Sequence, residues 1–361
     1  MKRMLKHLSK WGTAIAGLLF LCHASLALAL ELKPDAPARY TVKKNDTLWD
    51  IAGLFLDKPW LWPELWRNNT QILNPHLIYP GDVLVLKIVN GEPVLEMVRQ
   101  KTQVALSPNA TRTVKPYEPI SVLPWSVIEP YIQHHEILDV GQYELLPHLL
   151  GDKNGSMRFV DEDLVMSRRN GRAKDQYRVI RMQSTIEDLE GNELGVQIHH
   201  IADASMVEDR AEGEWLVRIA GSNSEAKRGD KLLFGQPKTA GDMELKPATA
   251  EQRAFVVGNL HQYELLGKYD VVIVDLGAEE IEPGTVMGIY QQGPIIIDGE
   301  EPKYATESKV VISVFDDGST VHQPALKVGE LIIFSTFTNA SYGIITRASD
   351  MVRTGNIVAQ P

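Results

Sequence analysis

The sequence predicts an α+β protein in which a small strand–helix–helix–strand module precedes mainly-β modules. Two patterns lead to this expectation. Between residues 40 and 86, two segments with apolar side chains at three- and four-residue spacing lie between two short alternating segments. Beyond residue 130, short β-branched runs are separated by Gly or Asp, which is typical of all-β structure.

Composition narrows the class of protein. The chain has 361 residues, of which 44% are hydrophobic, and its 47 acidic and 37 basic residues give a formal net charge of −10. That composition is globular, and the length suggests two or three domains at roughly 100–200 residues each. Nucleic-acid binding needs a positive surface, so the acidic balance argues against a nucleic-acid partner.

Residues 1–29 have the three-part pattern of a secretory signal peptide. A basic start, an apolar stretch and a small-x-small site are formed by Lys2, Arg3, Lys6, Lys10, residues 11–21 and Ala27-Leu28-Ala29. We expect cleavage after Ala29 and export. An uncleaved anchor is the alternative, although the apolar stretch is shorter than the ~20 residues that a membrane span needs. No second long apolar run follows, so we do not expect an integral membrane protein after cleavage.

Cys22 is the only cysteine of the chain and lies inside this leader. Phe20 and Leu21 precede it and are too bulky for a lipid-attachment site, so we interpret Cys22 as apolar filler. The mature chain then has no disulfide and no thiol nucleophile. Loss of four basic and no acidic residues takes the formal net charge from −10 to −14.

The small module can be justified element by element. A strand at residues 40–42 is followed by a turn, and Asp46 or Thr47 caps a helix whose apolar side chains fall on one face. Pro59 stands near the start of a second helix, where a missing N–H is tolerated. A Pro-Gly turn then leads into a strand at residues 83–86.

This segment resembles a LysM domain, which we expect over residues 38–88. The family has Gly-Asp-Thr-Leu-x-x-Ile-Ala after its first strand, and Asn-Pro and Pro-Gly-x-x-Leu before its last. The matching positions, in order, are Asp46-Thr47-Leu48, Ile51-Ala52, Asn74-Pro75 and Pro80-Gly81-Asp82-Val83-Leu84. Asn45 stands in place of the usual Gly, which the turn tolerates because both residues accept positive φ. The resemblance covers about a seventh of the chain.

The resemblance implies binding of β-1,4-linked N-acetylglucosamine polymers, which in bacteria are the glycan strands of peptidoglycan. The family's groove lies between the loop after the first strand and the loop before the last. Carried over by motif, the glycan-binding residues are Asp46, Thr47, Leu48, Asn74, Pro75, His76 and Ile78. Polar groups would bond the acetamido and hydroxyl groups, while Leu48 and Ile78 would pack on the apolar sugar surface. In the alternative interpretation, Asp46 or Thr47 only caps the helix and Asn74-Pro75 only shapes a turn.

Four of the seven tryptophans of the chain lie close together in this module, namely Trp49, Trp60, Trp62 and Trp66. Stacking on a sugar is one use for them. Large apolar rings more often pack in a core or between domains, which is the role that we expect here. Trp60 follows Pro59 between the two helices and is the tryptophan that we expect to be exposed.

The remainder is expected to be a connector and two β modules. Residues 89–130 are rich in Pro, Thr, Ser and Val, which predicts an extended connector. The β modules are placed at residues 131–245 and 251–361, the second as a candidate repeat of the first. Two signals suggest the repeat: Gln-Tyr-Glu-Leu-Leu at 142–146 and 262–266, and a Gly turn before an apolar strand at Gly229, Gly284, Gly329 and Gly355. Residues 274–284 also resemble small barrel modules of envelope assembly proteins, which contact other proteins.

The sequence lacks the motifs of the enzymes that such modules often accompany. Without a mature Cys there is no thiol nucleophile, and neither His-x-His nor His-Glu-x-x-His is present for a zinc peptidase. No Gly-x-Ser-x-Gly or phosphate-binding loop occurs. His134-His135 and His199-His200 are adjacent pairs in expected strands, where neighbours point to opposite faces, so neither pair should chelate one metal. We therefore expect no catalytic residue, no cofactor and no metal.

Together these features predict a non-catalytic, exported protein of the periplasm that is peptidoglycan-associated. It would bind glycan strands through its LysM domain and present its β modules to an envelope protein partner. The alternative is a peptidoglycan-remodelling hydrolase with catalytic carboxylates in the β region, since sequence alone does not exclude a pair among 47 acidic residues. A subunit of a secretion or appendage apparatus that wall binding positions is a third interpretation.

Overall fold

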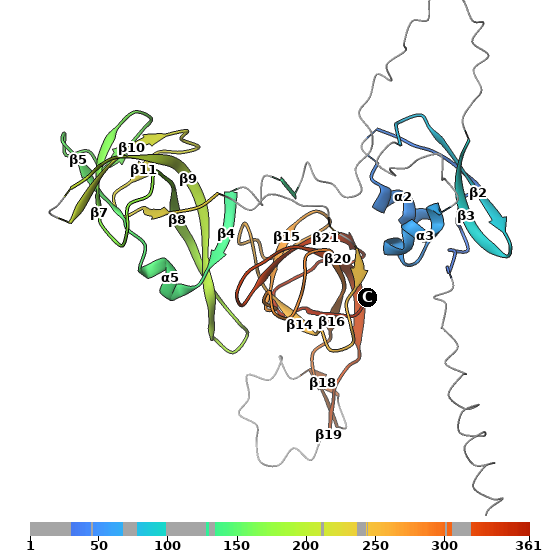
Figure 1. The fold of residues 1–361 in the computed structure, drawn as a ribbon. Helices are drawn as coiled ribbons and strands as arrows, with labels where there is room; N and C mark the ends of the chain where they lie inside the picture. The colour runs from blue at the N-terminus through green and yellow to red at the C-terminus, as the bar shows by residue number, and fades with distance from the viewer. Residues whose placement is uncertain are drawn as a thin grey trace, which may run out of the picture. The chain divides into compact units, whose positions relative to one another are not determined.

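The computed structural model describes residues 30–44, 46–67, 78–98, 128–129, 134–210, 213–236, 243, 245–299, 302–304 and 319–361. The chain divides into two compact units, residues 1–123 and 124–361. The first contains a small module of helices and strands and the second contains β modules, as Figure 1 shows. This confirms the expected α+β class. Residues 1–29, the expected leader, lie outside the described residues.

The first unit has the expected order of strand, helix, helix and strand. Its elements are β1, Arg39–Thr41; α2, Leu48–Phe55; the 3₁₀ turn η1, Pro59–Leu61; α3, Trp62–Trp66; and β2, Val83–Val89, which pairs with β1. Helix α2 begins where predicted because Thr47 caps it. The Thr47 hydroxyl accepts from the Asp50 N–H at 3.0 Å and donates to the Asp50 carboxylate at 2.7 Å.

A third strand extends this sheet within the segment that we expected to be connector. Strand β3, Glu92–Val98, pairs with β2 along its whole length. Asn90 and Gly91 join the two strands with φ of 55° and 86°, the positive values that a tight type I′ hairpin turn requires. Residues 92–98 of the expected connector are therefore sheet, and residues 99–127 lie outside the described residues.

The third strand completes the core of the module. Trp66 of α3, together with Leu95 and Met97 of β3, belongs to one buried apolar cluster with residues of α2 and β2. Each large side chain fully buried in such a cluster contributes on the order of 1.5–3 kcal/mol. Strand β3, which the resemblance did not include, therefore packs against the tryptophan-bearing helix α3.

The second unit begins with a closed sheet that we call the first barrel. Its strands are β5, Leu149–Asp152; β7, Leu164–Arg168; β8, Gln176–Glu187; β9, Glu193–Asp209; β10, Glu214–Ala220; and β12, Lys231–Leu233. Their order is β12-β8-β9-β10-β7-β5. An antiparallel bridge between His148 and Lys231 joins the two edges, and the Leu149 N–H donates to the Asp230 carbonyl at 2.9 Å. The sheet therefore closes around a buried core that contains Trp215.

Short elements outside the closed sheet are attached to the first barrel. Strand β4, His135–Leu138, pairs with β9 outside the closed circuit, and helix α5, Val140–Glu144, follows it. Strands β6, Arg158–Phe159, and β11, Ala226–Lys227, pair with each other. The additions on β9 matter for function because they cover one end of the outer face of strands β8 and β9.

The second barrel follows at the C-terminal end of the sequence. Its strands are β14, Ala254–Asn259; β15, Val271–Val274; β16, Thr285–Gln292; β20, Ala325–Thr336; β21, Ser341–Ala348; and β22, Ile357–Ala359. The order is β16-β20-β21-β15-β14-β22, and β22 also pairs with β16, which closes the barrel. Strand β13, Lys246–Pro247, pairs in parallel with β16.

An arm leaves the second barrel between β16 and β20. It is a small sheet of β17, Ile296–Asp298; β18, Lys303–Tyr304; and β19, Ser319–Val321, in the order β18-β17-β19. In the first barrel the connection at the same place, between β8 and β9, is the short turn at residues 188–192. Among the described residues, no helix combines the length and apolar character that crossing a membrane requires.

The two barrels have the same strand order and connectivity. Reading each set along the chain, β5, β7, β8, β9, β10 and β12 occupy the places of β14, β15, β16, β20, β21 and β22. Local geometry repeats as well: Glu162 and Tyr269 have φ of 72° and 74°. Each is followed by an aspartate, Asp163 or Asp270, whose carboxylate accepts a backbone N–H three residues earlier, at 2.9 and 2.8 Å.

The last strand of each barrel is introduced by the same turn. Gly229 and Gly355 have φ of 88° and 90°, which favours glycine over any residue with a Cβ. Asp230 and Asn356 follow them, and the side chain of each accepts a backbone N–H from three residues earlier, at 2.7 and 2.8 Å. The glycine turns that suggested a repeat are equivalent at these two positions, whereas the pentapeptides are not. Residues 142–146 precede β5, and residues 262–266 lie between β14 and β15.

Candidate functional site

Two residues of the expected glycan groove hold the turn between β1 and α2. Asp46 accepts hydrogen bonds from the Tyr40 hydroxyl at 2.8 Å and from the Lys43 N–H at 2.7 Å. Burial, and next the hydrogen bond to Asp46, raise the pKa of Tyr40 to about 12. Thr47 is the cap of α2 and is buried. Both side chains therefore have structural partners, as the alternative interpretation of these residues anticipated.

Two further residues of the expected groove are brought together, but inside the core. Leu48 and Ile78 are 4% and 0% exposed and belong to the same apolar cluster. Their side chains consequently offer no apolar surface to a ligand in this structure, and their backbone groups are what they can contribute. Asn74, Pro75 and His76, the remaining expected residues, lie outside the described residues.

The tryptophans of this module are mostly core residues. Trp49, Trp60 and Trp66 are 3%, 5% and 8% exposed, and Trp62 is partly buried. The expectation that Trp60 is exposed is wrong. Pro59 and Trp60 form the buried start of η1, so the ring is enclosed by the fold of the inter-helix segment.

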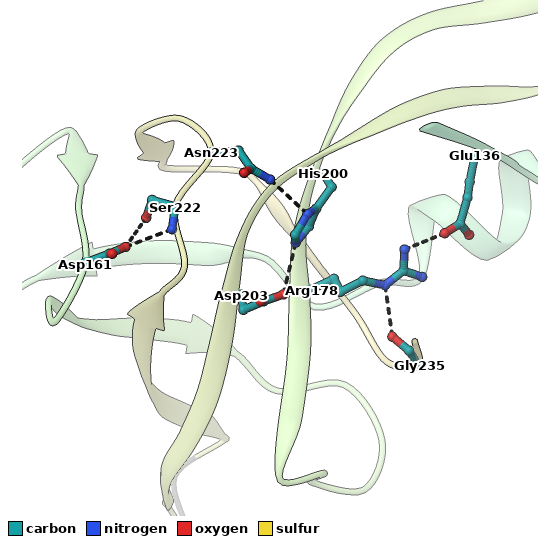
Figure 2. Close-up of polar contacts among 8 residues, drawn as sticks. All are labelled: Glu136, Asp161, Arg178, His200, Asp203, Ser222, Asn223 and Gly235. Carbon is teal, nitrogen blue, oxygen red and sulfur yellow. Dashed lines mark hydrogen bonds and ion pairs between the residues drawn. The ribbon is translucent and has the colours of Figure 1, made fainter. Parts of the chain in front are cut away.

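The first barrel carries a cleft of about 1040 Å³ on the outer face of β8 and β9. Tyr177 and Val179 point into the barrel core, so Arg178 between them points outward. Asp203 of β9 lies directly opposite Arg178 in the register of the two strands. Both residues line the cleft, together with Lys174, His200 and Phe234. Figure 2 shows the polar contacts of this region.

Arg178 is a buried charged group with two partners. Its Nη1 forms an ion pair with Glu136 of β4, and its Nε donates to the Gly235 carbonyl at 2.9 Å (Figure 2). The side chains of Arg178 and Glu136 are 9% and 13% exposed. A pair buried this deeply needs good geometry to offset the cost of desolvation. No ion pair joins Arg178 to Asp203 within the described part of the chain, although they are cross-strand neighbours.

His200 is held in one orientation. Its Nε2 donates to the Asp203 carboxylate at 3.0 Å, and its Nδ1 accepts from the Asn223 amide at 3.2 Å. The loop that carries Asn223 is anchored in turn, because the Asp161 carboxylate accepts from the Ser222 N–H at 2.9 Å and also from its hydroxyl (Figure 2). These contacts lower the pKa of Asp161. The wall of the cleft is therefore ordered by several linked hydrogen bonds.

The two histidine pairs meet across β4 and β9. His134 stacks on His200 with ring centroids 6.0 Å apart, and His135 faces His199 at 6.2 Å. Burial, followed by the neighbouring imidazoles of His199 and His261, lowers the pKa of His135 to about 4. No group of three or more potential metal ligands occurs in the residues that the structure describes. The sequence pattern placed neighbours on opposite faces but did not show that the strands would pair.

The cleft was not predicted from the sequence. The one signal for it was a charged residue inside an otherwise apolar β run, Arg178 followed by Val179 and Ile180. Its partner Glu136 is 42 positions away, and only the pairing of β4 with β9 brings it close.

Comparison with known proteins defines the class of the first module. Residues 40–87 match the family model of the LysM domain. That range agrees with the segment whose motif and strand–helix–helix–strand order are described above. The match supports binding of N-acetylglucosamine-containing glycans such as peptidoglycan.

One relative can be named. Over 60 residues the chain is 42% identical to a Bacillus subtilis (strain 168) protein called Uncharacterized protein YqbP. The similarity covers 14% of this chain and 27% of that protein, so the chain spans only about a quarter of the length of the curated relative that it matches. The C-terminal region of the chain is matched neither by the family model nor by this relative.

Proposed function

We propose that this is an exported, non-catalytic protein of the bacterial cell envelope that binds peptidoglycan through residues 40–87. The observation that carries the proposal is the LysM match on a segment that keeps the capped helix α2 and the strand order of the module. The barrels would present a surface to an envelope protein partner, since they make up most of the chain.

In this proposal the groove acts mainly through polar and backbone groups. Leu48 and Ile78 fix the two loops by packing in the core, and backbone groups of these loops would bond the acetamido and hydroxyl groups. Asp46 and Thr47 shape the first loop through the contacts already described. Asn74, Pro75 and His76 would supply the opposite side of the groove.

A hydrolytic role is the competing proposal, and one carboxyl group bears on it. Burial raises the pKa of Asp275, the direction that a general acid requires. However, Asp275 already accepts the Phe255 N–H at 2.6 Å, which ties it to the wall of the second barrel. We therefore assign Asp275 a structural role. The absence of a cysteine beyond Cys22 further supports a protein without thiol chemistry.

Co-sedimentation with purified peptidoglycan sacculi tests the proposal. The chain from Leu30 onward should pellet with sacculi and should release no soluble muropeptides into the supernatant. A chain that also lacks residues 38–98, which removes β3 along with the rest of the module, should stay in the supernatant. Equal pelleting of both chains would contradict binding through the module, and released fragments would favour the hydrolase.

The partner proposal needs a separate experiment. Crosslinking in intact cells, with reactive groups placed on the barrels, should capture a specific envelope protein. A protein that crosslinks only to the wall or to itself would contradict a role in presenting the barrels to a partner.

A further inference from the structure

The cleft of the first barrel is not required by the barrel fold. The second barrel has the same strand order, and the position that corresponds to Arg178 there is Gly288. Arg178 pairs with the third residue of β12, as Gly288 pairs with the third residue of β22. A Cβ at Gly288 would lie 2.8 Å from the Tyr290 ring and 3.1 Å from the Pro361 Cα. Tyr290 and Pro361 therefore already occupy the surface above Gly288. One barrel thus has a polar cleft where the other is covered.

The buried ion pair in the cleft also needs an explanation other than stability. Burying two charges costs several kcal/mol per ion, and apolar replacements of such pairs are often neutral or stabilising. The second barrel closes with a glycine at the same place. The Arg178–Glu136 pair is therefore better explained by what it presents to the cleft than by what it contributes to folding.

The surface of the cleft at this pair offers one free donor, on Arg178, beside one acceptor, on Asp203. Arg178 is 7% exposed and uses Nε and Nη1, which leaves Nη2 without a partner among the described residues. Asp203 lies opposite Arg178 on the same face and uses Oδ1 for His200. Side chains directly opposite on paired strands have Cβ atoms roughly 4.5–5.5 Å apart. A ligand group that both accepts and donates, such as a hydroxyl or an acetamido group, fits between them.

The charges of the lining favour an uncharged ligand. Lys174 and Arg178 are balanced by Asp175 and Asp203, and Glu136 lies behind them. Phe234 adds an exposed ring, with the Lys174 ammonium 4.8 Å from its centroid. That contact contributes only about 0.5–1 kcal/mol at an exposed site, so a ligand can displace the ammonium from the ring. The volume is at the upper end for ligand pockets, roughly 300–1,000 Å³, which suits an oligomer.

Strand pairing argues against an extended peptide as the occupant. Strands β8, β9 and β10, which line the cleft, each have a paired strand on both sides, and β12 covers the outer edge of β8 from Arg178 to Ile180. A peptide that binds by adding a strand needs an unpaired edge. The cleft instead offers side-chain donors and acceptors around an aromatic ring, which is the chemistry of sugar recognition.

We propose that this cleft is a second carbohydrate site, which takes an uncharged, N-acetylated oligosaccharide through Arg178, Asp203 and Phe234. The inference rests on the proposed function in one respect. The glycan that the LysM module would bind is itself an N-acetylated oligosaccharide, so the same ligand could occupy both sites. Two sites on one chain would raise retention on a polymer above the affinity of either site alone.

Titration calorimetry with soluble tetra-N-acetylglucosamine tests the proposal on the chain from Leu30 onward. We expect two binding sites per chain. Asp203→Asn and Phe234→Ala, both at exposed side chains, should each weaken one site by about tenfold or more and leave the other unchanged. Asp298→Asn and Met351→Ala, at exposed positions outside the cleft, serve as matched controls and should change neither site.

A variant of the first module separates the two proposals. Asn74→Ala with His76→Ala should remove the LysM site and leave the cleft site. A single site per chain that this double variant removes, and that the cleft variants do not affect, would overturn the cleft proposal alone. A site lost only in the cleft variants would overturn the LysM proposal alone. No binding, or binding of a peptidoglycan stem peptide in place of the saccharide at the cleft, would also overturn the cleft proposal.

Discussion

The two barrels use one backbone plan for two different surfaces. They share strand order, the turn before the last strand and the positive φ at Glu162 and Tyr269. They differ on the outer face of the third strand. There the first barrel exposes a cleft around Arg178, whereas Tyr290 covers the second and donates to the Gln360 carbonyl at 2.7 Å. The comparison teaches that the cleft arises from side chains and short additions and not from the barrel itself.

The largest effect should come from emptying one barrel core. Trp215→Ala removes a 1% exposed side chain of the first barrel and should destabilise it by about 3–5 kcal/mol. Because the two barrels have separate apolar clusters, calorimetric unfolding should show the transition of the first barrel shifted and that of the second retained. Leu331→Ala, at a fully buried side chain in the apolar cluster of the second barrel, is the reciprocal variant. Equal shifts of both transitions by either variant would mean that the barrels unfold as one unit.

Breaking the buried ion pair should have the next largest effect. Glu136→Gln leaves the Arg178 charge without its carboxylate and should cost about 3 kcal/mol, measured by urea unfolding. Adding Arg178→Met should recover most of this loss, since the second barrel is closed with a glycine at the equivalent position. A double variant less stable than Glu136→Gln would show that the pair is needed for folding, and the two barrels would then not differ in this respect.

Acid should weaken the first barrel more than the second. The pKa of His135 is lowered to about 4 from its ordinary 6.5, so the unfolded chain takes up a proton before the native barrel does. The contribution of the neutral His135 to the free energy of unfolding is therefore fully present above pH 6.5. It is lost as the pH decreases toward 4, by roughly 2 kcal/mol after allowance for partial exposure. Unfolding at pH 7.5 and pH 4.5 measures this loss. His135→Asn should flatten the dependence, and an unchanged slope would assign it to another group.

The smallest effect should come from the shared turn. Gly229→Ala and Gly355→Ala place a Cβ at φ near 90°, and each should cost about 1 kcal/mol in its own barrel. Gly267→Ala is a suitable control, because φ there is not positive and no atom lies within 4 Å of the added Cβ. Clearly unequal costs at Gly229 and Gly355 would show that the two turns are less alike than their hydrogen bonds indicate.

Features of the first module could be predicted because they are local. The cap at Thr47 and the apolar face of α2 depend on residues within one or two helical turns. The Asn90-Gly91 turn is also local, and an Asn-Gly pair between apolar runs is a strong hairpin signal that our connector assignment overlooked. For the groove, the motif identified the loops, but it could not show that Leu48 and Ile78 point into the core.

Features of the barrels depend on pairing between distant segments. β-Rich runs predicted strands, but nothing in a run such as residues 271–274 states that its partners are β14 and β21. The same limit applies to the cleft, where Arg178 meets Glu136 only after β4 has added to β9. The candidate repeat shows the same limit, because sequence identity and structural equivalence do not coincide there. An identical pentapeptide occupied unrelated positions, while the equivalent turns share only glycine and one side-chain acceptor.

The arm of the second barrel shows where the first can be altered safely. In one barrel the link between the third and fourth strands carries a small three-stranded sheet, and in the other it is a turn at residues 188–192. The same closed circuit therefore accommodates both a few residues and a sizeable insertion at that point. A fluorescent tag or an affinity peptide inserted after Glu190 should leave the first barrel folded, which would give a handle for following the protein in cells.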